Sequence, residues 1–441
     1  MPGTGYATIL ALTILVTAPV VVRAQQATVS GLPSPYIDPA GGLGLDEAIA
    51  RAEEREPGLR ATRSEVDAAR GRRQQSALRP NPTTTFEGRR EPGGTDSLVS
   101  IGVEWPLDLF RRAGRIGTAT QQVTASELEV VDRERTLAGD VRLQYGRVAA
   151  AIRQAQIAAD VASTVERQLG VMRARVDEGA APRLESDLLE VELRRLQADR
   201  DLAEGRAERA VLALKPLLGM APGEALALRE PIDVLVATRR AAATAVETAT
   251  VDERSDVRAA AQQVAVAGAA VDQARRDGRF DVGLFASYMR MDSGFPQLAL
   301  TASGGPERVR GQFHYLSGGV MVMVPLLNRN QGQIAAAQAE RVAAEARRSA
   351  AQLAAATEVA TALARDRQAQ QALTAYAETT RSLARRNLEV VSQTFELGRA
   401  TVFDVLAEQR RYLEFEQAYT TTLLEVWEAR ADLVRARGDV K

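Results

Sequence analysis

The stretch Glu54-Arg55-Glu56-Pro57-Gly58-Leu59-Arg60-Ala61 is repeated later in the chain as Asp252-Glu253-Arg254-Ser255-Asp256-Val257-Arg258-Ala259, 198 residues further on (252 − 54). A second match, Trp105-Pro106-Leu107 with Val324-Pro325-Leu326, lies 219 residues apart (324 − 105). The second copy therefore carries about 20 extra residues before its Pro-Leu turn. The period of the repeat is far too long for a solenoid. We expect one pseudo-symmetric body made of two large equivalent halves.

Composition excludes several classes of function. The charge is balanced, with 56 basic and 57 acidic residues, so there is no electrostatic footprint for nucleic acid. Lys215 and Lys441 are the only lysines and neither follows a glycine, which excludes a Walker-type phosphate loop. There is no cysteine and one histidine, His314, which we expect to be solvated in a loop. We predict no enzyme activity, no cofactor and no metal site.

The first residues are typical of a secretory signal. Ala7 to Val22 form a largely apolar run, followed by Val22-Arg23-Ala24, which places small residues before a cleavage site. The run is shorter than the roughly 20 residues that a membrane anchor requires. We therefore predict a signal peptide at 1–24, followed by an N-terminal arm at 25–42, and export across the inner membrane.

Long helices are predicted where proline is absent. The ranges 107–181, 232–295 and 326–441 contain no proline, which would cost about 3 kcal/mol inside a helix. The range 332–397 is rich in Ala, Gln, Glu and Arg and is expected to form about 60 residues of helix. An apolar stripe with helical spacing lies near the C-terminus, namely Tyr412, Phe415, Tyr419, Leu423 and Val426.

The proline-rich intervals between these helices show the period of two that is typical of strands. Strands are expected at about 83–89 and 98–106 in the first half, and at about 281–291 and 316–325 in the second. Each half then consists of helix, strand, long loop, strand, helix and helix. Four strands cannot close a barrel, so a barrel would require several chains.

The two faces of these strands differ in polarity. Apolar residues on one face and polar residues on the other, in strands of about ten residues, are typical of an outer-membrane barrel, although a soluble sandwich strand would alternate in a similar way. The residues expected to face lipid are Val103, Trp105, Val322 and Val324. Those expected to face a lumen are Glu104, Met321 and Met323.

Several motifs resemble one known family. They are Leu45-Asp46-Glu47-Ala48-Ile49 followed by Pro57-Gly58-Leu59, Leu78-Arg79-Pro80-Asn81-Pro82, and the turn Val324-Pro325-Leu326-Leu327-Asn328-Arg329-Asn330-Gln331-Gly332-Gln333-Ile334. Together with the duplication they resemble TolC-type outer membrane efflux proteins, and are most similar to the branch that serves heavy-metal export. The resemblance covers roughly 43–437, with a first repeat at 43–220, a linker at 221–240 and a second repeat at 241–437.

The resemblance implies a mostly helical fold with a small β part. Three copies would form a homotrimer whose twelve strands close one outer-membrane β-barrel, continued by a long periplasmic α-helical barrel. The assembly would be a passive exit duct that contacts outer membrane lipid, a periplasmic adaptor and an inner-membrane pump. Heavy-metal cations are its candidate cargo. The alternatives are a periplasmic adaptor or structural helical-hairpin protein, and a secreted coiled-coil adhesin, which would need sustained heptads.

The family's tunnel narrows near the helical tip of the second half, where aspartates line a constriction. The resemblance implies that Asp404 is the first of these aspartates; Ala407 stands where a second would be, with Glu408 beside it, and Asp187 is the counterpart in the first half. Three symmetry-related carboxylates around an axis would favour cations. Alternatively, Asp404 is a carboxylate placed at a helix N-terminus by the helix macrodipole.

Four methionines of the second half, Met289, Met291, Met321 and Met323, suggest a copper site, because thioethers suit Cu(I). The alternative is that they fill apolar space in strands, since methionine is a common packing residue. We favour packing.

Overall fold

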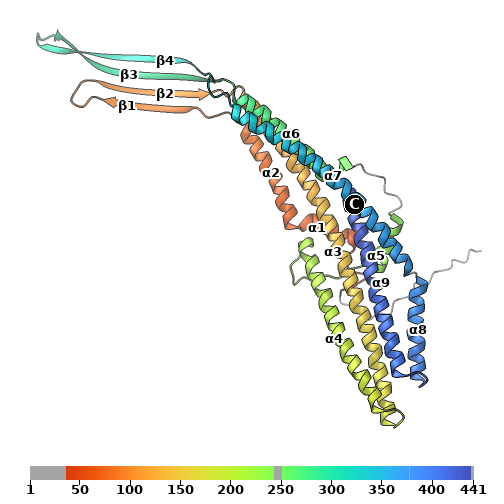
Figure 1. The fold of residues 1–441 in the computed structure, drawn as a ribbon. Helices are drawn as coiled ribbons and strands as arrows, with labels where there is room; N and C mark the ends of the chain where they lie inside the picture. The colour runs from red at the N-terminus through yellow and green to blue at the C-terminus, as the bar shows by residue number, and fades with distance from the viewer. Residues whose placement is uncertain (1–35, 243–250, 377, 439–441) are drawn as a thin grey trace, which may run out of the picture.

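The computed structural model describes residues 36–242, 251–376 and 378–438 (Figure 1). The predicted signal peptide and residues 25–35 of the predicted arm lie outside the described residues. The elements, in chain order, are α1 (Leu45–Arg55), α2 (Pro57–Ala77), β1 (Thr83–Arg90), β2 (Ser97–Pro106), α3 (Arg111–Asp177), α4 (Arg183–Leu214), η1 (Lys215–Leu218), α5 (Ile232–Ala242), η3 (Val251–Glu253), α6 (Ser255–Asp277), β3 (Asp281–Leu300), β4 (Pro306–Met323), α7 (Gln331–Ala375), α8 (Glu378–Glu396) and α9 (Val402–Arg437).

The molecule is an elongated helical bundle with a sheet extending from one end (Figure 1). The central element is α3, whose 67 residues correspond to about 100 Å and which contacts α2, α4, α6 and α9. The antiparallel pairs α3–α4 and α8–α9 form the end of the bundle opposite the sheet. Among the described residues, no helix is both long and apolar enough to cross a membrane.

Small residues allow the long helices to approach closely. The buried residues of α7 are all alanine, namely Ala337, Ala344, Ala355, Ala362 and Ala369. On α3, Gly146 lies under the ring of the buried Trp427 of α9, and a Cβ atom at this glycine would lie 2.0 Å from Trp427 Cδ1. Close packing through alanine and glycine explains how a chain with 4% aromatic residues builds a large buried core.

The single helix predicted over 332–397 is wrong. The segment contains two helices, α7 and α8, because α7 ends at Ala375. The next residue, Tyr376, leaves helical geometry, and its ring packs against Phe415 and Tyr419 of α9, with ring centroids 5.6 and 6.3 Å apart. Neither glycine nor proline marks this break, so helix propensity alone could not reveal it.

The four strands form one antiparallel sheet in the order β1-β2-β3-β4. Pairing of β2 with β3 joins the two halves of the chain, with Trp105 opposite Leu284 and Val99 opposite Arg290. In the described part of the chain the outer edges of β1 and β4 have no strand beside them. Unpaired edges of this kind are templates for pairing with another chain.

The second hairpin is longer than predicted. β3 continues to Leu300 instead of about 291, and β4 begins at Pro306 instead of about 316, so the extra residues of the second half extend a β-ribbon and do not form a long loop. Pro296 lies at the irregularity between Gly294 and Leu298, where a missing N–H donor is tolerated. His314 therefore lies on a strand and not in a loop, although its side chain is exposed.

Candidate functional site

The pairing register defines two faces of the sheet, which we call the tryptophan face and the glutamate face after Trp105 and Glu104. Trp105 is opposite Leu284, which in turn is opposite Val320. Alternation along the strands then places Val103 and Val322 on the tryptophan face. Val324 lies one residue beyond the end of β4.

Large apolar side chains are exposed on the tryptophan face in a single chain. They are Phe86, Val99, Ile101, Val103, Trp105, Leu284, Tyr288, Leu316, Val320 and Val322. A contiguous apolar surface of this kind marks an interface with a membrane or with another protein. We therefore expect a membrane or another protein to cover the tryptophan face.

The glutamate face is more mixed. Glu104 lies opposite Thr83 of β1 and Phe285 of β3, among serine and glycine residues of the same rows. Met321 and Met323 belong to this face, because Phe285 is opposite Gly319 and alternation continues from there. That the tryptophan face meets lipid and the glutamate face meets water stays a prediction.

The four methionines do not form one cluster. Met289 and Met291 lie opposite Tyr315 and Phe313, whereas Met321 lies opposite Gly283. Six residues of strand, or about 20 Å, separate Met289 from the level of Met321. In the described part of the chain, no group of three or more His, Cys, Asp or Glu side chains is arranged to hold a metal ion.

At the opposite end of the molecule, the two helical hairpins turn at equivalent glycines. Gly179 and Gly398 have φ of 73° and 74°, which non-glycine residues rarely adopt. Beside them, one apolar cluster joins all four helices of the tip, and its buried members are Val161, Ala162, Val165, Leu169, Met172, Leu189, Leu193, Leu196, Phe395, Val402 and Val405. The tips of the two halves are thus packed as one unit.

Asp404 lies in the first turn of α9 and takes part in a capping box. Its Oδ2 accepts hydrogen bonds from the backbone N of Thr401 at 3.0 Å and from Thr401 Oγ1 at 2.7 Å, while Thr401 Oγ1 accepts from the Asp404 backbone N. The Thr401 side chain, and then its backbone, lowers the pKa of Asp404. The helix-terminal role that we considered as an alternative is therefore present, and the exposed carboxylate remains ionised.

The other two predicted entrance residues have different surroundings. Glu408, one turn further along α9, is half-buried and accepts a hydrogen bond from Arg411 at 3.2 Å. Asp187 is exposed on α4, two residues before Leu189 of the tip cluster. The structure places all three carboxylates on the helices of one tip.

Polar contacts that the sequence did not reveal join the two hairpins of this tip. Arg175 of α3 donates to the backbone carbonyls of Phe395, at 3.1 Å, and Glu396, the last residues of α8, and its guanidinium lies over the Phe395 ring. Gln409 of α9 donates to Gln168 of α3 at 2.6 Å, and both side chains are buried. Their positions 220 or more residues apart gave no signal in the sequence.

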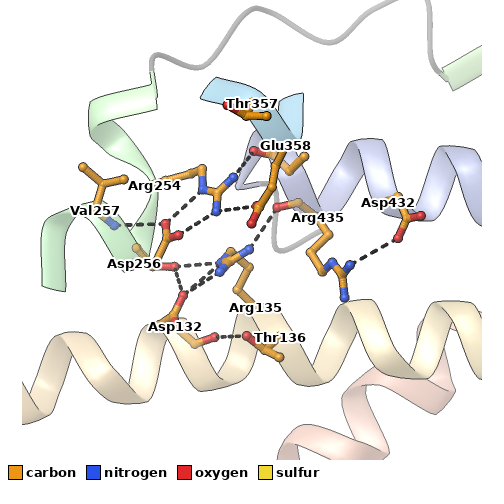
Figure 2. Close-up of polar contacts among 12 residues, drawn as sticks. Asp132, Arg135, Thr136, Arg254, Asp256, Val257, Thr357, Glu358, Asp432 and Arg435 are labelled. Carbon is orange, nitrogen blue, oxygen red and sulfur yellow. Dashed lines mark hydrogen bonds and ion pairs between the residues drawn. The ribbon is translucent and has the colours of Figure 1, made fainter. Parts of the chain in front are cut away.

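A second buried polar group ties the start of the second half to the end of the chain (Figure 2). The Arg254 side chain, 3% exposed, donates to the carbonyl of Ala436 at 3.0 Å and pairs with Asp256 and Glu358. Arg135 of α3 donates to the carbonyl of Arg435 at 3.0 Å. Arg254 satisfies the carbonyl of Ala436 in the last turn of α9, and Arg135 is a second donor to the Arg435 carbonyl, which also accepts from the Gly438 backbone N.

A third buried group lies at the start of α8. Arg153 of α3 donates to Glu416 Oε2 at 2.8 Å and to Thr420 at 2.9 Å, both on α9, and also pairs with Asp233. Arg381 of α8 donates to the other oxygen of Glu416 at 3.1 Å. One buried carboxylate thus joins α3, α8 and α9 close to the break between α7 and α8.

The chain combines a duplicated helix-strand unit, paired helical hairpins, and a four-stranded sheet with open edges and an uncovered apolar face. This combination defines a class of protein, the subunits of outer-membrane channels with a long helical extension. The model of the family described as outer membrane efflux protein matches residues 48–220 and 249–439, most of the chain. The protein belongs to this family and is an outer-membrane efflux channel with a large periplasmic portion. A comparison with curated proteins gave no significant match.

Solved structures share the fold. The open state of the MtrE outer membrane channel of Neisseria gonorrhoeae is 21% identical, with a TM-score of 0.67 and coverage of 89% of this chain and 88% of that one. The CmeC outer membrane channel of Campylobacter jejuni is 13% identical, with a TM-score of 0.68 and coverage of 89% and 85%. The outer membrane protein VceC of Vibrio cholerae is 16% identical, with a TM-score of 0.65 and coverage of 89% and 96%.

Proposed function

We propose that three copies of this chain form one exit duct through which an inner-membrane pump and a periplasmic adaptor expel their cargo. The observation that carries the proposal is the four-stranded sheet with two open edges. In a trimer, β1 of one copy pairs with β4 of the next, which closes twelve strands and removes every edge. The tryptophan face then meets lipid and the glutamate face lines the lumen, where Glu104, Met321 and Met323 lie.

The helical tip is the periplasmic entrance in this proposal. Three copies bring three Asp404 carboxylates around one axis, with Glu408 and Asp187 nearby. A ring of ionised carboxylates attracts cations and repels anions. The capping box supports this role, because it fixes the carboxylate and lowers its pKa while leaving the side chain exposed.

Planar-bilayer recording tests both the proposed duct and the proposed ring of carboxylates. Purified protein should form channels, and addition of a trivalent cation on the side of the helical tip should reduce their conductance. Asp404→Ala should weaken this block at least tenfold, whereas Asp67→Ala, an exposed aspartate of α2, should not change it. Failure of the wild-type protein to conduct would contradict the duct. Block that is unaffected by Asp404→Ala would contradict the carboxylate ring.

Metal cations are the cargo that we propose to test first, because of the resemblance around Val324–Ile334 to proteins of heavy-metal export. A passive duct does not need to coordinate its cargo, and the pump would select it. A strain that lacks the gene should become sensitive to copper, silver, zinc or cobalt salts and recover with the wild-type gene. Sensitivity only to organic drugs would point to another cargo.

A further inference from the structure

The tryptophan face changes character along β4. In the half nearer the helices, its residues are Leu316, Gly318, Val320 and Val322. In the half nearer the hairpin turn, they are Arg308, Arg310, Gln312 and His314, all of them exposed. About 20 Å of apolar strand is therefore followed directly by a cationic segment on the same face.

The neighbouring strands also carry charged side chains at this level, although the exposed Leu298 of β3 lies directly opposite Arg308. Arg290 of β3 lies opposite His314 on one side and Val99 on the other. One row further from the helices, Arg90 of β1 lies opposite Ser97 of β2, which is level with Asp292. Four arginines, Arg90, Arg290, Arg308 and Arg310, thus share this part of the face with one carboxylate.

The surrounding charges do not neutralise these arginines. Arg290 lies 3.5 Å from Asp292, whose oxygens also accept hydrogen bonds from Ser97 and Gln312. Within the described part of the chain, Arg90, Arg308 and Arg310 form no ion pair. At these levels the opposite, glutamate face carries Arg89 and Glu307. The turn between β1 and β2 adds Glu91 and Asp96, and Asp96 accepts hydrogen bonds from Ser293 and from the Gly294 backbone N, so the positive charge in excess lies on the tryptophan face.

The border between the apolar and cationic parts is marked by an aromatic residue. Tyr288 lies opposite Ile101 and Leu316, and its hydroxyl is 2.7 Å from Nδ1 of His314 in the first cationic row. Tyrosine with an apolar ring and a polar tip is typical of the interface between hydrocarbon and headgroups. The hairpin turns point away from the helices (Figure 1), so this border lies on the side of the sheet remote from the periplasmic portion.

We propose that Arg90, Arg290, Arg308 and Arg310 form a binding surface for phosphorylated lipid headgroups of the outer leaflet, with acyl chains along the apolar rows below. The proposal rests on the orientation proposed above, with the tryptophan face towards lipid. Guanidinium groups bind phosphate oxygens through two parallel hydrogen bonds. Because the apolar and cationic rows adjoin, a lipid satisfies both at once, whereas free phosphate satisfies only the second.

The test uses the full-length protein in neutral detergent, titrated with a fluorescent bisphosphorylated lipid A and, separately, with phosphatidylcholine. Each arginine beside an anionic lipid surface contributes about a fivefold gain in affinity. Affinity for lipid A should therefore fall about fivefold in Arg90→Gln and about 30-fold in Arg308→Gln/Arg310→Gln. The matched control is Arg89→Gln, the neighbouring residue on the glutamate face, which should bind as the wild type does.

Three results would overturn the proposal: unchanged affinity in Arg308→Gln/Arg310→Gln, an equal loss in Arg89→Gln, or competition by inorganic phosphate at the same phosphate concentration as the lipid. Conductance in neutral phosphatidylcholine bilayers separates this proposal from the duct. All variants should conduct there as the wild type does. A wild-type protein that conducts but shows no preference for lipid A contradicts only the lipid surface, and one that fails to conduct contradicts the duct.

Discussion

At the scale of single residues, the two halves of the chain place opposite charges at the N-cap of an equivalent helix. Glu56 is the N-cap of α2, where it accepts from the backbone N of Leu59 and contacts Arg133 of α3. The repeat aligns Glu56 with Arg254, the N-cap of α6, which pairs instead with Glu358 of α7. The duplication has kept a charged N-cap that pairs with the next long helix, α3 or α7, and has reversed its sign, so the pairing could not be predicted from the repeat alone.

Replacement of Arg254 should destabilise the protein strongly. Arg254→Met leaves Asp256 without its main cation and the Ala436 carbonyl without its donor. Leaving a buried acceptor without its donor costs about 1–3 kcal/mol, and more where the group is charged. Thermal unfolding followed by circular dichroism should show this loss, whereas Arg70→Gln, which breaks an exposed pair with Glu127, should cost about 1 kcal/mol or less. Similar curves for both variants would contradict the role of Arg254.

Acid should loosen the helical tip through Asp404. Because the folded-state pKa lies below the ordinary value of 3.8, the stabilisation is complete above that value and is lost as pH falls through the lower folded pKa. Limited proteolysis between about pH 6 and about pH 2, with an acid-tolerant protease, should show cleavage near Gly398 rising at the acid end. Asp404→Asn should be cleaved more readily at neutral pH and should lose this part of the pH dependence. If the cleavage of Asp404→Asn depends on pH in the same way as that of the wild type, Asp404 is not the group responsible.

At the scale of elements, the proline-free ranges 107–181 and 326–441 contain α3, α7, α8 and α9, whereas 232–295 ends in β3 and α4 lies outside all three ranges. Period-two alternation predicted four strands. These sequence patterns did not predict helix breaks and strand lengths that depend on tertiary contacts. The break after Ala375 follows from aromatic packing of Tyr376 on α9, and the extension of β3 and β4 follows from pairing between segments that alternate weakly and contain Pro296. The charged groups around Arg175 and Glu416 join distant elements and left no local pattern.

Contact between α3 and α9 depends on the absence of a side chain at Gly146. Gly146→Ala would drive a methyl group into the buried Trp427 ring, whose Nε1 is held by the carbonyl of Arg142 at 2.8 Å. Overpacking of this kind costs about 1–3 kcal/mol. Gly170→Ala on the same helix meets no atom within 4 Å and should stabilise the protein by up to about 1 kcal/mol. Thermal midpoints that shift in the same direction would contradict this packing.

At the scale of the whole molecule, the sequence duplication determines how many strands and hairpins one chain provides. Two halves give four strands and two helical hairpins, and the structure joins them through β2 and β3 into a sheet that is still open. An open sheet with an uncovered apolar face is an incomplete unit, which is the physical reason to expect several copies. The sequence could indicate this requirement but not the register between copies.

The most direct test of the trimeric duct is cross-linking of the two open edges. The chain has no cysteine, so Thr85→Cys on β1 provides a unique thiol on the glutamate face. It is combined in turn with a cysteine at each glutamate-face position of β4 from Glu307 to Met323, because closing a barrel staggers the strands by an amount that one chain does not define. A short bis-maleimide applied to outer membranes should convert at least one of these double variants into covalent dimers and trimers, and should leave each single variant monomeric in denaturing gels. A full series of double variants that stays monomeric, or single variants that cross-link equally well, would contradict closure of one barrel by β1 and β4 of neighbouring copies.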